Sequence, residues 1–151
     1  MSTRRTDPEA GTRALLDWAA AVASGTPAAR AVRATAVRHT LELFAEEFPG
    51  RSVELRVPPF GAVQALPGAR HTRGTPPAVV ETDDQTWLAL VTGSLTWADA
   101  RAQGRLRASG ERSDLSDQLP LPGPRRTVRE AIAGQSGESG QSGQAGQESP
   151  S

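Results

Sequence analysis

The sequence has no cysteine and no long hydrophobic run. Without cysteine there is no disulfide framework, no thiolate nucleophile and no sulfur ligand for a metal ion. No window approaches the roughly 18 consecutive apolar residues that a membrane span needs. The two arginines near the N-terminus are not followed by the apolar stretch of a signal peptide. We therefore expect a soluble, cytoplasmic protein with no integral membrane insertion.

Lysine is absent as well, since all 17 basic residues are arginine, and 17 acidic residues balance them. With a formal net charge of +0, the electrostatic field favours neither nucleic acid nor an anionic membrane, and we expect no nucleic-acid partner. The exclusive use of arginine, together with abundant alanine, is typical of a genome rich in G and C. Selection for bidentate contacts with phosphate or carboxylate is the alternative explanation.

Catalytic and metal-binding patterns are also missing. The two histidines, His39 and His71, are far apart in the sequence and have no carboxylate at ligand spacing. No Ser/His/Asp arrangement, carboxylate pair or phosphate-binding glycine loop stands out. The Gly-Glu-Ser-Gly run at residues 137–140 has no flanking strand and helix to form a nucleophile elbow. We expect a protein that is not an enzyme and that uses no cofactor or metal.

The 151 residues are long enough for one ordinary domain and a tail. Apolar residues make up 36% of the chain, and their shortage is greatest at the C-terminal end. The sequence predicts a flexible N-terminus over residues 1–11, one domain over residues 12–121 and a disordered Gly/Gln/Ser-rich tail over residues 122–151. Within this tail, the short run "TVREAIA" is a candidate for a transient helix.

Hydrophobic periodicity predicts two amphipathic helices at the start of the domain. In the first, Leu15, Trp18, Ala19 and Val22 recur at helical spacing. The second is predicted to open at Thr26-Pro27 and to end near Phe48, before a Pro-Gly stop. Each helix has one apolar face and therefore needs a surface to cover.

Further along the chain the hydrophobic period changes from helical spacing to alternation, which predicts strands. Strands are expected at residues 53–57, 62–66, 78–82 and 105–109, with a weakly marked one at residues 69–73. Two short helices are expected between the last two strands: an aspartate cap opens the first and Gly93 ends it, while a Thr96 cap opens the second. A last helical turn is expected through Leu115 and Leu119.

The segment "VVETDDQTWLALVTGSLTWADARAQGRLRASGERSDLSDQLPL" resembles the sterol-carrier-protein type 2-like family, specifically its small stand-alone members in actinobacteria. An acidic cap follows a strand there, then two short helices that each end in glycine, then a strand of the type "GRLRASG". Ala108 stands where larger branched residues are common in the family. The stretches "VELRVPPFGAVQ" and "HTRGTPPAVVETD" are also similar.

This resemblance implies an α+β fold, with a mostly antiparallel sheet of about five strands covered by helices and an apolar space between the layers. Relatives are associated with lipids such as sterols or fatty acyl chains. The expected function is therefore non-catalytic binding of a lipid or other apolar small molecule in a sheet–helix cavity. The alternative is a protein-interaction or regulatory domain with a filled core and no ligand.

Two groups of residues are candidates for ligand binding. The apolar group belongs to the short helices and the strand after them, and it is predicted to line the cavity: Trp87, Leu90, Val91, Leu95, Trp97 and Leu106. The polar group belongs to the hairpin and the following loop, and it is predicted to hold a carboxylate or phosphate head group: Arg56, Gln64, His71, Arg73 and Thr75.

Each group has a plainer interpretation. The apolar residues fill an ordinary core, because protein interiors are close-packed by default. The arginines of the polar group pair on the surface with Glu54 or Glu81, which contributes little to stability. His39 is an ordinary, partly buried helix residue.

Overall fold

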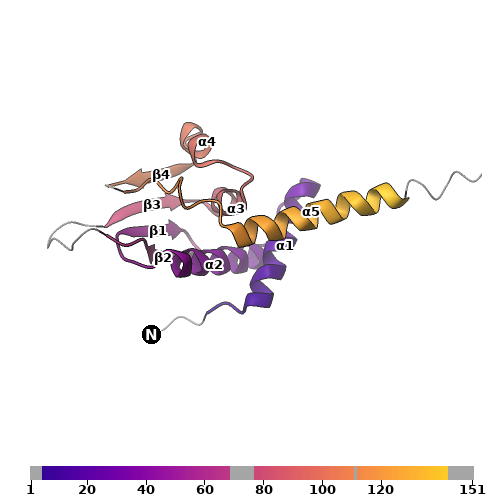
Figure 1. The fold of residues 1–151 in the computed structure, drawn as a ribbon, viewed down its shortest axis with the longest axis horizontal. Coiled ribbons are helices and arrows are strands. Elements are labelled where there is room, and N and C mark those ends of the chain that lie inside the picture. The colour runs from indigo at the N-terminus through magenta and orange to yellow at the C-terminus, as the bar shows by residue number, and fades with distance from the viewer. Residues whose placement is uncertain (1–4, 69–76, 111, 143–151) are drawn as a thin grey trace, which may run out of the picture.

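The computed structural model describes residues 5–68, 77–110 and 112–142, and it is built from a four-stranded sheet and five helices (Figure 1). The predicted α+β class is confirmed. Helix α2 packs on the sheet, α1 packs on α2, and α3 lies between α2 and α5. This layering leaves α1, α3 and α5 in contact away from the sheet.

Helix α1 (Pro8–Ser24) begins earlier than the predicted residue 12. The Asp7 carboxylate accepts a hydrogen bond from the Ala10 amide, and a proline in the first turn needs no partner for its missing N–H. Gly25, in the left-handed region at φ 70°, ends the helix. Residues 8–11, expected to be flexible, therefore belong to the helix.

Helix α2 (Arg30–Glu47) begins after the predicted Thr26-Pro27 start and ends before Phe48, as expected. Its buried stripe packs against α1 and the sheet. The stripe contains one histidine and one threonine among apolar side chains: Ala36, Val37, His39, Thr40, Leu41 and Phe44.

The four described strands pair in the order β2-β1-β3-β4. Strands β1 (Val53–Val57) and β2 (Gly61–Ala65) form the predicted hairpin. Strand β3 (Ala78–Thr82) lies parallel to β1, and β4 (Leu106–Ser109) lies antiparallel to β3.

The expectation of about five mostly antiparallel strands is therefore corrected to four described strands in a mixed sheet. The alternation of apolar and polar residues is the same in parallel and antiparallel strands, so it does not reveal that β3 passes β2 and pairs with β1. The weakly predicted strand at residues 69–73 lies outside the described residues.

The short helices follow the capping signals of the sequence. Asp83 caps α3 (Asp84–Thr92) by accepting from the Thr86 amide, and Gly93 ends it at φ 89°. Thr96 caps α4 (Trp97–Ala102) by accepting from the Asp99 amide at 3.1 Å. Both helices lie where they were predicted.

The C-terminal part of the described chain differs from the prediction. The residues around Leu115 and Leu119 form a turn, and the helix comes later, as α5 (Pro122–Ser142). Its backbone is tied to α3 by a hydrogen bond from the Leu121 amide to the Val91 carbonyl at 3.1 Å, and Val128 packs against the core. Residues 122–134 are thus helical where the sequence predicts a disordered tail with a transient helix only at "TVREAIA", and Figure 1 shows α5 extending beyond the rest of the fold.

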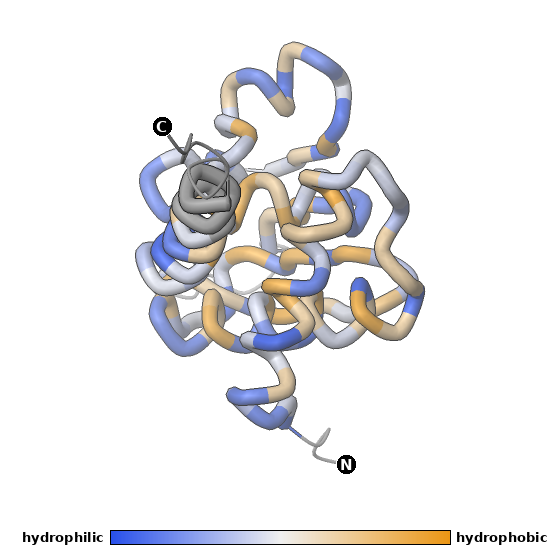
Figure 2. Tube along the Cα trace, turned by 90° about the vertical axis from the view of Figure 1, so that its right-hand side faces the viewer, coloured by the Kyte–Doolittle hydropathy of each residue, from blue (hydrophilic) through white to orange (hydrophobic). Residues whose placement is uncertain are grey.

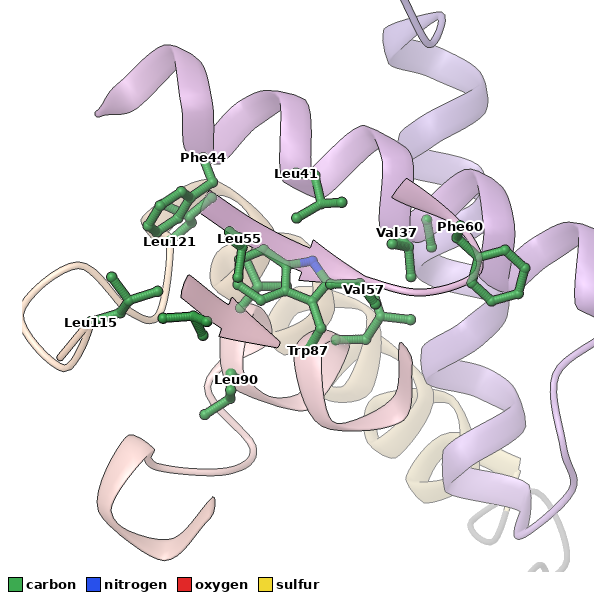
Figure 3. Close-up of a cluster of buried hydrophobic side chains, with 14 of the residues drawn as sticks. Val37, Leu41, Phe44, Leu55, Val57, Phe60, Trp87, Leu90, Leu115 and Leu121 are labelled. Carbon is green, nitrogen blue, oxygen red and sulfur yellow. The ribbon is translucent and has the colours of Figure 1, made fainter. Parts of the chain in front are cut away.

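The core is centred on Trp87, which lies among side chains of α2 and β1 (Figure 3). Its indole N–H donates to the Thr40 hydroxyl at 2.9 Å, and its ring meets Phe44 edge-on with centroids 5.7 Å apart. Apolar stretches of the chain gather toward the middle of the molecule (Figure 2). Every polar atom of Trp87 is therefore satisfied inside a packed core.

Candidate functional site

The predicted apolar lining residues divide between the core and the periphery. Trp87, Leu90 and Val91 are buried in the main cluster. Trp97 is buried on α4, and its indole N–H has no hydrogen-bond partner among the described residues. Leu95 and Leu106 are half-buried and pack against the cluster. Of these six side chains, Leu106 lines the groove at the edge of the sheet that is described below.

The polar candidates are on the open face of the sheet or outside the described residues. The Arg56 guanidinium donates to the Glu54 carboxylate at 2.9 Å, so this arginine is engaged in a surface ion pair. This hydrogen bond lowers the pKa of the exposed Glu54 carboxyl. Gln64 is exposed on β2, next to Glu54 in the strand register. His71, Arg73 and Thr75 lie outside the described residues.

A polar groove of about 260 Å³ lies at the edge of the sheet, and Leu106 is the one predicted apolar residue in it. Its polar groups already bond to one another: the Thr82 hydroxyl donates to the Arg105 carbonyl, and the Arg105 side chain donates to the Thr86 hydroxyl. These contacts hold β3, β4 and α3 together. The groove is lined by Pro58, Glu81, Thr82, Asp83, Gly104, Arg105, Leu106 and Arg107.

A larger and more apolar groove of about 360 Å³ lies between α1 and α5, which cross in Figure 1. The turn after α3 contributes a third wall. We call it the α1–α5 groove, and it is lined by Trp18, Ala19, Val22, Ala23, Thr92, Gly93, Ser94, Arg125, Val128, Arg129 and Ile132.

The first wall of the α1–α5 groove is the C-terminal half of α1. The buried Trp18 is fixed there, since its indole N–H donates to the Gln85 side-chain oxygen at 3.0 Å. Val22, one turn further along, is 53% exposed. An aromatic side chain held in place beside an exposed aliphatic one provides an apolar surface that is formed before any ligand arrives.

The turn after α3 closes one end of the groove. Gly93 adopts φ 89°, a conformation that favours glycine. A Cβ at this position would lie 3.3 Å from the Pro120 ring and 3.6 Å from the Arg125 Cδ atom. The stem of Arg125 therefore passes close to the turn. The hydroxyl groups of Thr92 and Ser94 donate to carbonyls of α3, so they are occupied.

The second wall is one face of α5. Ile132 is 51% exposed, and with Val22 it forms the exposed large hydrophobic surface of the described residues. Arg125 and Arg129 also lie on this face. The groove thus combines apolar walls with positive charge, a combination typical of small-molecule sites.

His39 is the buried titratable group of the described core, and it is separate from the groove. Its ring packs on Gly11 of α1. Burial lowers the pKa of its imidazole, with a smaller lowering from Arg5 and opposing effects of Glu42 and Glu46. This agrees with its interpretation as an ordinary, partly buried helix residue.

Two further findings bear on the kind of site. In the part of the chain that the structure describes, no three His, Cys, Asp or Glu side chains are arranged to hold a metal ion. No described helix combines the length and hydropathy needed to cross a membrane.

The sequence interpretation missed the α1–α5 groove as a site. The sequence pattern places Trp18 and Val22 only on the apolar face of a helix. It places the residues after 121 only in a tail. One signal was present, because Arg125, Val128, Arg129 and Ile132 recur at i, i+3, i+4 and i+7. The glycines and serines that follow obscured this short helical pattern.

Comparison with protein-family models gives one match, to the model described as bacterial SCP ortholog, over residues 29–121. This span includes the whole sheet and α2 to α4, while α1 and α5 lie outside it. A comparison with curated proteins finds no match. The groove walls supplied by α1 and α5 lie outside the matched span.

Proposed function

Because this chain belongs to the family of bacterial SCP orthologues, we propose that it binds an apolar small molecule of the lipid class without catalysing a reaction. The family match supports the class of ligand, and the geometry supports the α1–α5 groove as its location. The main observation that supports this location is that the two exposed large hydrophobic residues, Val22 and Ile132, line the same groove.

Three properties of this groove favour a small apolar ligand. Its volume, about 360 Å³, is within the range of roughly 300–1,000 Å³ that is usual for ligand sites. The exposed Val22 and Ile132 offer apolar area, which stabilises binding by about 25 cal/mol for each Å² removed from water. The interior around Trp87 is by contrast already packed, with its indole N–H satisfied by Thr40.

The surroundings of Trp97 are a second candidate location for the ligand. Trp97 keeps a buried indole N–H without a partner among the described residues, and Leu95 and Leu106 are half-buried. A ligand with a polar atom near Trp97 would satisfy this donor. Ligand contacts at Trp97 rather than at Trp18 would favour this location.

Calorimetric titration with monododecanoylglycerol and dodecanoate, below their micelle-forming concentrations, tests the proposed function. We expect binding of at least one of them at one site per chain. Replacing Ala23→Trp fills the groove and abolishes binding, whereas Thr12→Trp, on an exposed part of α1 outside the groove, leaves it unchanged.

Circular dichroism of both variants shows whether a loss of binding comes from the filled groove or from a damaged fold. If neither lipid binds the native chain, and organic extraction of the purified protein releases no lipid, the proposal is wrong. The interaction-domain alternative would then account for the exposed apolar surface.

A further inference from the structure

The charged residues of the α1–α5 groove are all of one sign. Arg125 and Arg129 line it, and no carboxylate is among the lining residues. Within the described residues, neither guanidinium takes part in an ion pair. Guanidinium groups form their strongest contacts with planar or tetrahedral oxyanions. The groove therefore has positive charge available for an anionic group.

The two arginines alternate with two apolar residues along the α5 wall of the groove. Along α5 the lining residues Arg125, Val128, Arg129 and Ile132 share one face of the helix. Seven residues of helical rise separate the first from the last, about 10 Å. Arg125 lies beside the Gly93 turn, and the exposed Ile132 lies seven residues further along the helix. Positive charge and apolar surface are thus interleaved along this wall of the groove.

This arrangement is unfavourable for the helix in the absence of a ligand. Arg125 and Arg129 are four residues apart, and like charges at this spacing destabilise a helix by about 0.2–0.5 kcal/mol. Arg125 also lies near the first turn of α5, at the positive end of the helix dipole, and that turn carries no acidic residue. An anion between the two guanidinium groups would relieve both repulsions.

We propose that the α1–α5 groove selects single-chain amphiphiles with an anionic head, a carboxylate or a phosphate. Arg125 and Arg129 bind the head, and the alkyl chain lies along Trp18, Val22 and Ile132. This inference rests on the proposed function, because it specifies the head group of the lipid-class ligand.

The test compares three probes with the same alkyl chain: dodecanoate, dodecyl phosphate and the neutral monododecanoylglycerol. We expect at least one anionic probe to bind the native chain about tenfold more tightly than the neutral one, since two charge-assisted contacts act at a half-open site. The double variant Arg125→Gln/Arg129→Gln lowers this ratio to about one. Added salt lowers it as well.

The matched control is Arg126→Gln. Arg126 is exposed on the same helix but does not line the groove. The variant therefore also removes a positive charge from α5, but it removes no side chain from the groove. We expect the native selectivity for the anionic probe in this variant. The ratio of dodecanoate to dodecyl phosphate affinity then assigns the head as carboxylate or phosphate.

Each of the remaining outcomes overturns the inference, and the outcomes can be told apart. Equal binding of neutral and anionic probes contradicts the head-group selectivity and leaves the proposed function standing. An equal loss in Arg126→Gln reveals unspecific attraction by the helix. No binding of any probe, together with no lipid released on organic extraction, contradicts both proposals. If light scattering shows self-association through Val22 and Ile132, the exposed apolar surface of the groove is instead an interface with a second copy of the chain.

Discussion

At the scale of single residues, the contact between Gly11 and His39 joins α1 to α2. The imidazole packs where a side chain on residue 11 would otherwise extend, so glycine is required by space and not by a positive φ. The backbone of α1 comes close to α2 at this point, and the two helices share many contacts. Because α1 forms one wall of the groove, this contact fixes the position of that wall.

Gly11→Ala is expected to destabilise the protein by about 1–3 kcal/mol, although alanine is the better helix former, because the new Cβ overlaps the His39 ring. The matched control is Gly134→Ala in α5, where no atom lies within 4 Å of the new Cβ, and this variant gains up to about 1 kcal/mol. Urea unfolding measures both. Equal stability of the two variants would contradict the close packing, whereas rescue of Gly11→Ala by His39→Ala would support it.

The lowered pKa of His39 predicts a pH dependence of stability. The unfolded chain takes up a proton near the usual value of 6.5, and the folded chain does so only at a lower pH. The free energy of unfolding is therefore at its full value above this pH, and it falls as the pH decreases through 6.5 toward the folded pKa. Urea midpoints measured across this window in native protein and His39→Gln test the prediction. The fall should be smaller in the variant, and an identical fall in both would exclude His39 as its cause.

At the scale of elements, the sequence predicts some parts well and others poorly. The short helices agree with the prediction because their caps, Asp83 and Thr96, are local hydrogen bonds between neighbouring residues. The partner of β3 could not be predicted, since pairing depends on contacts distant in sequence. Helix α5 was missed because tertiary contacts of Leu121 and Val128 stabilise a segment whose composition favours disorder.

Helix α5 supplies one wall of the groove, so truncations at its two ends should differ in effect. A chain that stops after Gly134 keeps every lining residue of α5 and should bind the lipid with native affinity. A chain that stops after Leu121 loses Arg125, Val128, Arg129 and Ile132 and should lose binding while its sheet persists. Calorimetry and circular dichroism measure the two properties. Native binding by the shorter chain would exclude α5 from the site.

At the scale of the whole molecule, the matched span contributes only the turn after α3 to the candidate site, and α1 and α5 contribute the rest. Residues 29–121 contain the sheet and its covering helices, and their packed interior surrounds Trp87. The groove lies outside that interior, where α1 and α5 cross. The sequence resemblance therefore predicted the family correctly. The location of the groove depends on how two flanking helices pack, which the resemblance does not specify.

The central claim is that the ligand binds in the α1–α5 groove. Nitrogen–proton correlation NMR tests it most directly, because each of the 3 tryptophans has its own indole N–H signal. The full chain is titrated with dodecanoate. Trp18 lines the groove, Trp87 lies in the packed core and Trp97 lies on α4. We predict that the Trp18 indole signal shifts with saturation while those of Trp87 and Trp97 stay in place. A saturable shift of Trp97 without one of Trp18, or no shift at all, would contradict the assignment of the ligand to the α1–α5 groove.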